Sequence, residues 1–120
     1  MHVLLVESEA PVVRLIAWFL VDAGFAVARV APDGDIVGVA DECGAAVVVF
    51  NAGILPDAKR RQIELLHNSA NSPGVLDVSD GARRALPDTS ADAYLMLPFD
   101  ADDLVAAVRQ LAAVRSTQGR

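Results

Sequence analysis

Five short runs of apolar and β-branched residues recur along the chain, and longer segments with helical spacing separate them. The runs are His2–Val6, Phe25–Val30, Ala45–Phe50, Gly74–Val78 and Ala93–Leu97. Several of them are almost wholly apolar rather than alternating, which is typical of strands buried on both faces. The sequence therefore predicts an α/β fold, with a five-stranded parallel sheet and helices on both of its faces.

The first and second helices are predicted from the segments that follow the first two runs. The first should begin near Glu9, with Pro11 in its first turn, and stop at Gly24. Its expected buried stripe is Val12, Leu15, Ile16, Phe19 and Ala23. A shorter helix is expected from about Asp35 to Glu42.

Two more helices are predicted in the second half of the chain, with a weaker helical segment between them. The first runs from about Asp57 to His67, and the last opens at Asp100, whose carboxylate can cap free N–H groups. The buried stripe of the last helix is expected to be Leu104, Val108, Leu111 and Val114. Gly81 and Pro87 bracket the segment between these helices, so a fourth helix there should be short or partly unwound.

Composition indicates one folded domain without disulfides. The chain has 120 residues, and 53% of them are hydrophobic, enough to bury a core and too many for a disordered segment. Its single cysteine, Cys43, favours a cytoplasmic protein. The apolar run from Leu15 to Val21 is shorter than the roughly 20 residues that span a bilayer, so no membrane segment is expected. We expect a domain over residues 1–115, followed at 116–120 by a frayed tail or the start of a truncated linker.

The charge balance argues against nucleic acid as a direct partner. Ten basic residues stand against sixteen acidic ones, for a net charge of −6, and such a field repels a phosphate backbone. We therefore expect no direct binding of nucleic acid by this domain, and a homodimer is compatible with the sequence.

Four segments occur in a characteristic order and spacing: Leu4–Glu9, Ala23–Val27, Ala31–Gly34 and Tyr94–Asp100. Together they resemble the receiver domain of bacterial two-component response regulators, and the resemblance extends over essentially the whole chain. It implies a flavodoxin-like fold with the strand order 2-1-3-4-5. It also places Tyr94 at the position of the aromatic residue that switches conformation in that family.

The resemblance implies a phosphorylation chemistry that this sequence lacks. In the family, acidic residues after the first strand hold magnesium, an aspartate ending the third strand accepts a phosphoryl group, and a hydroxyl residue and a lysine bind that group. The corresponding positions here form a degenerate site, at Glu7, Ser8, Asn51, Ser79 and Leu97, with Ala52 as the other occupant of the acceptor position. An amide cannot form an acyl phosphate, and Glu7 beside neutral Ser8 is a poor magnesium cage. We therefore expect no metal and no cofactor.

The leading hypothesis is an atypical receiver, or pseudo-receiver. It is not an enzyme, does not depend on phosphorylation, and signals by contact with a protein partner or a fused output domain. One alternative is a small-ligand sensor, in which the vacated site would use Glu7, Glu9, Asn51, Ser79 and Asp80. Another alternative is residual phosphotransfer through an unorthodox acceptor such as Asp57.

Two surfaces are candidates for protein contact. Trp18 and Val21 fall outside the predicted stripe of the first helix, beside Arg14, and tryptophan is enriched at interface hot spots. The competing interpretation has Trp18 folded over its own neighbours. The second surface, which the resemblance implies because the family commonly uses it for output, combines the fourth helical segment, the fifth strand and the last helix; its candidate residues are Arg83, Arg84, Val105 and Arg109.

Overall fold

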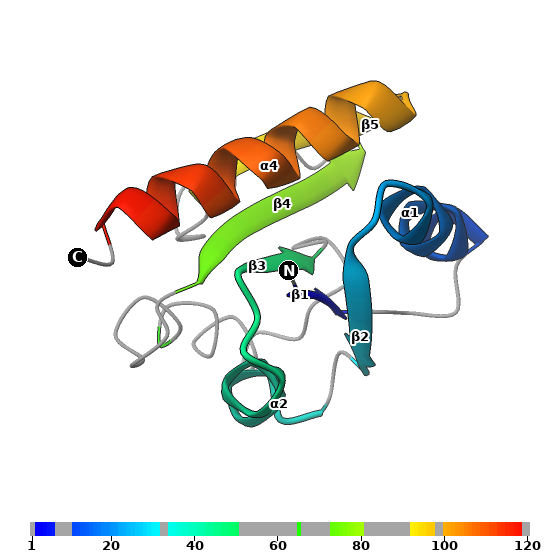
Figure 1. Cartoon of the computed structure of the whole chain (residues 1–120). Helices are drawn as coiled ribbons and strands as arrows, with labels where there is room; N and C mark the ends of the chain where they lie inside the picture. The colour runs from blue at the N-terminus through cyan, green and yellow to red at the C-terminus, as the bar shows by residue number, and fades with distance from the viewer. Residues whose placement is uncertain are drawn as a thin grey trace.

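A parallel five-stranded sheet forms the centre of the protein, as seen in a computed structural model (Figure 1). The structure describes residues 2–6, 11–31, 34–50, 65, 73–80, 92–97 and 100–118; within these ranges, the side chains of 11–13, 79, 80, 94, 96, 97 and 114–118 are not described. The strands lie in the order β2-β1-β3-β4-β5. Their bounds are β1 His2–Val6, β2 Ala26–Val30, β3 Val47–Phe50, β4 Gly74–Asp80 and β5 Ala93–Leu97.

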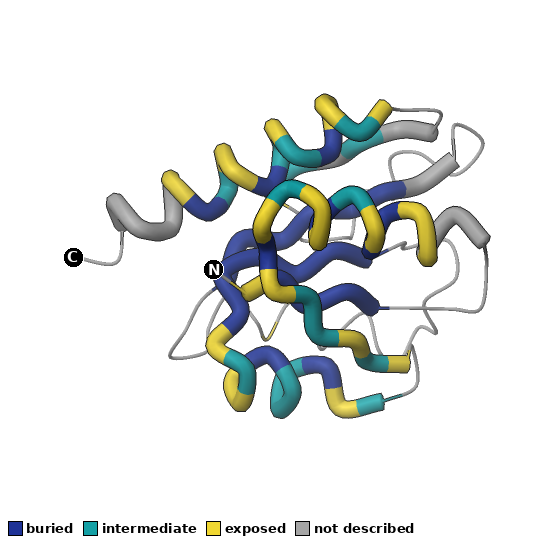
Figure 2. Tube along the Cα trace, turned by 45° about the vertical axis from the view of Figure 1, so that its right-hand side comes forward, coloured by how far each residue is buried: buried dark blue, intermediate teal, exposed yellow. Residues whose placement is uncertain are grey.

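Helices cover both faces of this sheet. Helices α1 (Pro11–Asp22) and α4 (Ala101–Gln118) lie on one face, and α2 (Ile36–Cys43) lies on the other (Figure 1). Because successive side chains of a strand point to opposite faces, β1 supplies both cores: Val3 and Leu5 pack toward α1 and α4, whereas Leu4 and Val6 pack toward α2. The expected α/β architecture is thus confirmed, and most described residues of the central strands β1, β3 and β4 are buried (Figure 2). His2, at the start of β1, is exposed.

Local signals set several helix ends. The Asp35 carboxylate accepts a hydrogen bond from the Gly38 N–H at 3.0 Å and starts α2. The Asp100 carboxylate accepts from the Asp103 N–H at 2.9 Å and starts α4, as predicted. Gly24 follows the end of α1 with φ 97°, a conformation that glycine adopts without a steric cost.

The buried stripe of α1 differs from the predicted one. Among its described side chains, Ile16, Ala17 and Leu20 are buried, while Leu15, expected inside, is 49% exposed. The helix is rotated relative to the prediction, since it packs both on the sheet and against α4, and Leu15 then falls on the outer face, one turn before Trp18. Val12 lies outside the described side chains.

The division into a domain over residues 1–115 and a frayed tail or truncated linker at 116–120 stays a prediction. Helix α4 itself extends to Gln118. Among its described side chains, Leu104, Val108 and Ala112 are buried and Leu111 is half-buried, while the expected Val114 lies outside the described side chains. A Cβ atom on Gly74 would come within 3.0 Å of the Leu111 Cβ, so the absence of a side chain at Gly74 lets α4 pack closely on β4. The predicted helix from Asp57 to His67, of which only Leu65 is described, and the fourth helical segment lie outside the described residues.

Candidate functional site

The first candidate site is the carboxyl edge of the sheet, where parallel α/β proteins bind ligands. Strands β1 and β3 end at Val6 and Phe50, directly before Glu7 and Asn51 in the chain. Glu7, Ser8 and Asn51 themselves lie outside the described residues, as do Glu9 and Asp57. In the sequence, three positions of the degenerate site therefore come directly after the ends of β1 and β3.

Strand β4 is longer than predicted, which changes the position of Ser79. Ser79 and Asp80 were expected to follow the strand, but they are its last two residues, because they pair with Met96 and Leu97 of β5. Leu97 is the last residue of β5 and lies opposite Asp80. The backbone therefore brings the Ser79 and Leu97 positions to the same edge, on adjacent strands and one register step apart.

Asp92 fixes the register between these two strands. Its carboxylate accepts a hydrogen bond from the Val75 N–H at 2.8 Å, and its own N–H donates to the Val75 carbonyl at 2.9 Å. This two-way link lies at the start of β5, and the pairing runs from there to Asp80 and Leu97. It helps to determine which residues of β4 and β5 meet at the carboxyl edge.

Asp77 is a residue near this edge that sequence reasoning missed. It is 4% exposed, and its neighbours in register are Phe50 of β3 and Tyr94 of β5. Alternation along β4 puts it on the same face as Val75, the face covered by α2. A buried carboxylate needs polar compensation, and Asp77 is not without an interaction partner. The signal in the sequence was a lone acid inside an apolar run.

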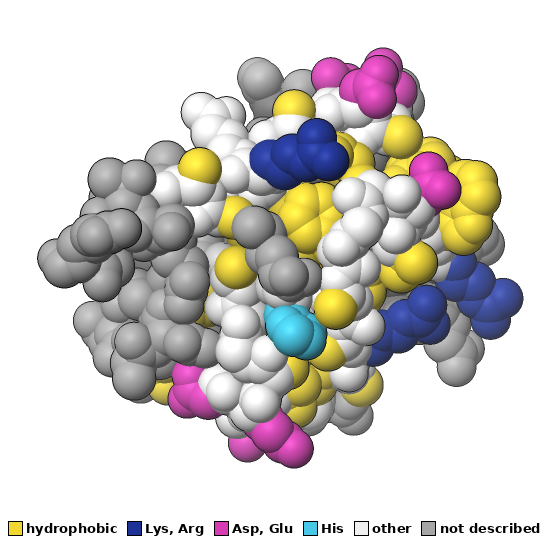
Figure 3. Space-filling view, in the orientation of Figure 1, with side chains coloured by type: hydrophobic (Ala, Val, Ile, Leu, Met, Phe, Trp, Pro, Cys, Tyr) yellow, Lys and Arg dark blue, Asp and Glu magenta, His cyan; other side chains and the backbone are white. Residues whose placement is uncertain are grey.

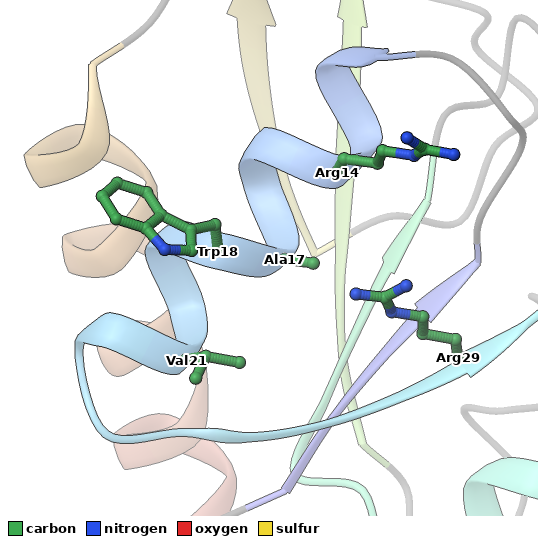
Figure 4. A pocket seen from close by; sticks show the side chains of 5 residues that line it. All are labelled: Arg14, Ala17, Trp18, Val21 and Arg29. Atoms are coloured by element: carbon green, nitrogen blue, oxygen red, sulfur yellow. The ribbon is translucent and has the colours of Figure 1, made fainter.

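The second candidate site is a hollow of about 410 Å³ between α1 and β2. It is lined by Arg14, Ala17, Trp18, Val21 and Arg29 (Figure 4). The expected exposure of Trp18 and Val21 is confirmed, at 64% and 57%. The Trp18 ring also contacts Phe19, with 5.9 Å between centroids, but that contact leaves most of the indole uncovered. Arg29, a residue of the edge strand, was missed because its position beside α1 depends on the tertiary fold.

The surface proposed around the last helix is described only in part. Arg109 is exposed on α4, whereas Val105 is half-buried against the core that α1 and α4 share. Arg83 and Arg84 lie outside the described residues, and the Tyr94 side chain is not described, although its backbone belongs to β5. The role of this surface in binding stays a prediction.

The described residues show neither a cluster of metal ligands nor a membrane-spanning helix. They contain no cluster of three or more His, Cys, Asp or Glu side chains arranged to hold a metal ion. No helix in the described part of the chain is both long and apolar enough to cross a membrane.

Solved structures similar to this chain include response-regulator receiver domains. NtrX from Brucella abortus, solved with ADP, aligns with a TM-score of 0.80 and 16% identity, over 98% of this chain and 27% of that chain. The signal receiver domain of a modulated diguanylate cyclase from Desulfovibrio desulfuricans G20 aligns with a TM-score of 0.80 and 16% identity, over 98% and 97%. A response regulator receiver protein from Sinorhizobium medicae WSM419 gives 0.75 and 23% identity, over 96% of each chain.

The comparison establishes the fold, which is the flavodoxin-like α/β fold of receiver domains. No family model matches the sequence, and no curated protein sequence matches it either. The chain spans 27% of NtrX, so it corresponds to one part of that protein.

Proposed function

We propose that this chain is an atypical receiver domain of a two-component system, which signals through protein contact and without phosphorylation. The observation that carries the proposal is Asn51, which directly follows the last residue of β3 in a receiver fold. Phosphorylation of a receiver forms an acyl phosphate on a carboxylate, and the neutral amide of Asn51 has no carboxylate oxygen to attack phosphorus. On this proposal the domain has no enzymatic activity of its own.

The ends of the neighbouring strands support the same proposal. Leu97, the last residue of β5, has no charge with which to neutralise a phosphoryl group. Ser8 contributes no carboxylate beside Glu7, and Mg²⁺ prefers anionic oxygen ligands. An acceptor, a cation and a metal ligand are therefore each replaced by a neutral side chain, and the replacements favour a role in which the site is not phosphorylated.

The partner is proposed to be a cytoplasmic signalling protein or an output domain fused to this one. Two of the similar structures carry names of larger assemblies, NtrX and a receiver-modulated diguanylate cyclase. The net charge of −6 makes direct binding of nucleic acid by this domain unfavourable. The output surface would combine the fourth helical segment, at Arg83 and Arg84, with the exposed Arg109 of α4.

Incubation with a small-molecule phosphodonor and Mg²⁺, followed by intact-mass measurement, tests the proposal. The wild-type protein should gain no phosphoryl group. The variant Ser8→Asp/Asn51→Asp/Leu97→Lys, which restores the three missing groups, should gain one that hydroxylamine removes. The restored variant is the matched control, because its labelling shows that the fold can still support the chemistry.

Labelling of the wild-type protein would overturn the proposal. If that label disappears in Asp57→Asn, the chain transfers phosphoryl groups through an unorthodox acceptor. If neither the wild-type protein nor the restored variant is labelled, the carboxyl edge is not a former phosphorylation site, and the assignment of that edge is wrong.

A further inference from the structure

The outer face of α1 is apolar, although its inner face already packs on the core. Leu15, Trp18 and Val21 are exposed at successive steps of three residues, so they form one stripe along the helix. Ile16, Ala17 and Leu20 are buried on the opposite side. A helix that is hydrophobic all round is normally buried all round. Figure 3 shows apolar side chains gathered over α1, next to basic ones.

The residues of this face are arranged symmetrically about Trp18. Leu15 and Val21 lie three residues before and after it, and the exposed Arg14 and Asp22 lie four residues before and after it. Arg14 and Asp22 are about 12 Å apart along the helix axis, at 1.5 Å per residue. The face therefore carries an apolar centre with a positive charge at one end and a negative charge at the other.

A second copy of the same face fits this arrangement in one orientation only. When two α1 helices pack antiparallel about a two-fold axis at Trp18, Arg14 and Leu15 of one copy lie level with Asp22 and Val21 of the other. Each end of the pair then combines opposite charges, and the apolar residues meet in between. A parallel arrangement would place Arg14 against Arg14 and Asp22 against Asp22, which is unfavourable.

The charges of α1 have no explanation within the helix itself. The helix dipole is positive at its N-terminus and negative at its C-terminus, so it favours acids early and bases late. Helix α1 has no acid in its first turn and no base in its last; instead Arg14 lies near its start and Asp22 is its final residue. Within the described part of the chain, neither side chain has a hydrogen bond or ion pair. An antiparallel partner provides the opposite charge for both.

We propose that the outer face of α1 is a homodimer interface, in which two copies pack antiparallel around Trp18. The contact is one helix face per copy, so the interface falls below the roughly 1,200 Å² of stable complexes and the dimer is weak and reversible. Trp18 is its central anchor, since tryptophan and arginine dominate interface energetics. The proposal is independent of the missing phosphorylation chemistry and of the surface around Arg109.

Intrinsic fluorescence provides a direct measurement, because Trp18 is the only tryptophan in the chain. Sedimentation velocity and emission spectra are recorded from about 1 µM to about 1 mM protein. We expect a concentration-dependent shift from monomer to dimer, and a blue shift of the emission over the same range as the indole becomes buried. A protein that stays monomeric to the highest concentration, or a dimer that leaves the emission unchanged, overturns the proposal.

Charge exchange tests the antiparallel geometry. Arg14→Asp and Asp22→Arg should each raise the dissociation constant of the homodimer at least about tenfold, because each places like charges at both ends of the helix pair. An equimolar mixture of the two variants should form a heterodimer, because an acidic side chain then faces a basic one at both ends of the helix pair. The double variant Arg14→Asp/Asp22→Arg should recover self-association for the same reason.

Matched controls carry the same charge changes away from α1. Asp41→Arg on α2 and Arg109→Asp on α4 are exposed substitutions and should leave the dissociation constant unchanged. Circular dichroism of every variant shows whether it is folded. If Arg109→Asp dissociates the dimer and Arg14→Asp does not, the copies associate through α4, and the proposal is wrong. Failure of the mixture and of the double variant to associate would likewise refute the antiparallel arrangement.

Discussion

Helices α1 and α4 cover the same face of the sheet, but their outer surfaces have opposite character. Their inner faces are alike: α1 buries Ile16 and Leu20, and α4 buries Leu104 and Val108 in the same core. The outer face of α4 is built from small and polar residues: Asp102, Asp103, Ala106, Arg109, Gln110 and Ala113. That of α1 presents Leu15, Trp18 and Val21 instead. Packing on the sheet explains why both inner faces are apolar, and the polar outer face of α4 is what a helix surface in water requires. Neither reason explains the apolar outer face of α1.

The two helices also place their charges differently along the helix axis. Asp102 and Asp103 lie in the first turn of α4, where the helix dipole favours them. Arg14 and Asp22 lie near the start and at the end of α1, where the dipole opposes both. The charges of α4 thus favour its own helix, whereas those of α1 oppose theirs and make no hydrogen bond or ion pair within the part of the chain that the structure describes.

The largest expected effect separates the two faces of α1. Leu20→Ala should lower the free energy of unfolding by about 2–5 kcal/mol, because it removes a fully buried side chain and leaves a cavity. Leu15→Ala, on the outer face, should cost less than about 0.5 kcal/mol. Urea denaturation at a protein concentration low enough to keep the chain monomeric measures both.

Equal losses for these two variants would contradict the distinction between a packing face and a free face. Leu104→Ala is the matched control on α4, and it should behave like Leu20→Ala, since Leu104 is buried in the same core.

The sequence was sufficient to predict most of the framework. Strand positions followed from runs such as Val47–Phe50, because short runs that are apolar at every position are typical of strands buried on both faces. Asp35 and Asp100 marked helix starts through a local hydrogen bond three residues ahead. These signals act within a few residues, so a single sequence contains them.

Features that depend on contacts between distant segments were harder to predict. The rotation of α1 that exposes Leu15 comes from packing against both the sheet and α4. The extension of β4 to Asp80 comes from pairing with β5. In that pairing Asp80 lies opposite Leu97, which is seventeen residues further along the chain. Arg29 was missed for the same reason, whereas Asp77 had a local signal in the sequence, a lone acid inside an apolar run. The exposure of Trp18 was predicted because the helical period alone separates it from the buried stripe.

A smaller effect is expected at the start of α4. Asp100→Ala should lower the free energy of unfolding by about 1 kcal/mol, since it removes the acceptor of the Asp103 N–H. Asp100→Asn is the matched control, because an asparagine oxygen can still accept that hydrogen bond, and it should cost only a few tenths of a kcal/mol. Thermal unfolding of both variants is the measurement, and equal losses would show that charge rather than the cap stabilises this end.

The smallest expected effect on stability comes from replacing an acid at the C-terminal end of a helix by lysine. This change separates the effect of the charge on its own helix from its effect on the proposed homodimer. Asp22→Lys should raise the stability of the monomer by about 0.3–1 kcal/mol, because it places a base at the negative end of α1. Asp41→Lys, in the last turn of α2, should raise it by a similar amount for the same reason. Only Asp22→Lys should also weaken self-association, because it sets a lysine level with Arg14 of the second copy. Denaturation at low protein concentration and sedimentation at high concentration separate the two quantities. If both variants gain stability and both associate as the wild type does, Asp22 has no role between copies, and its position at the end of α1 needs another explanation.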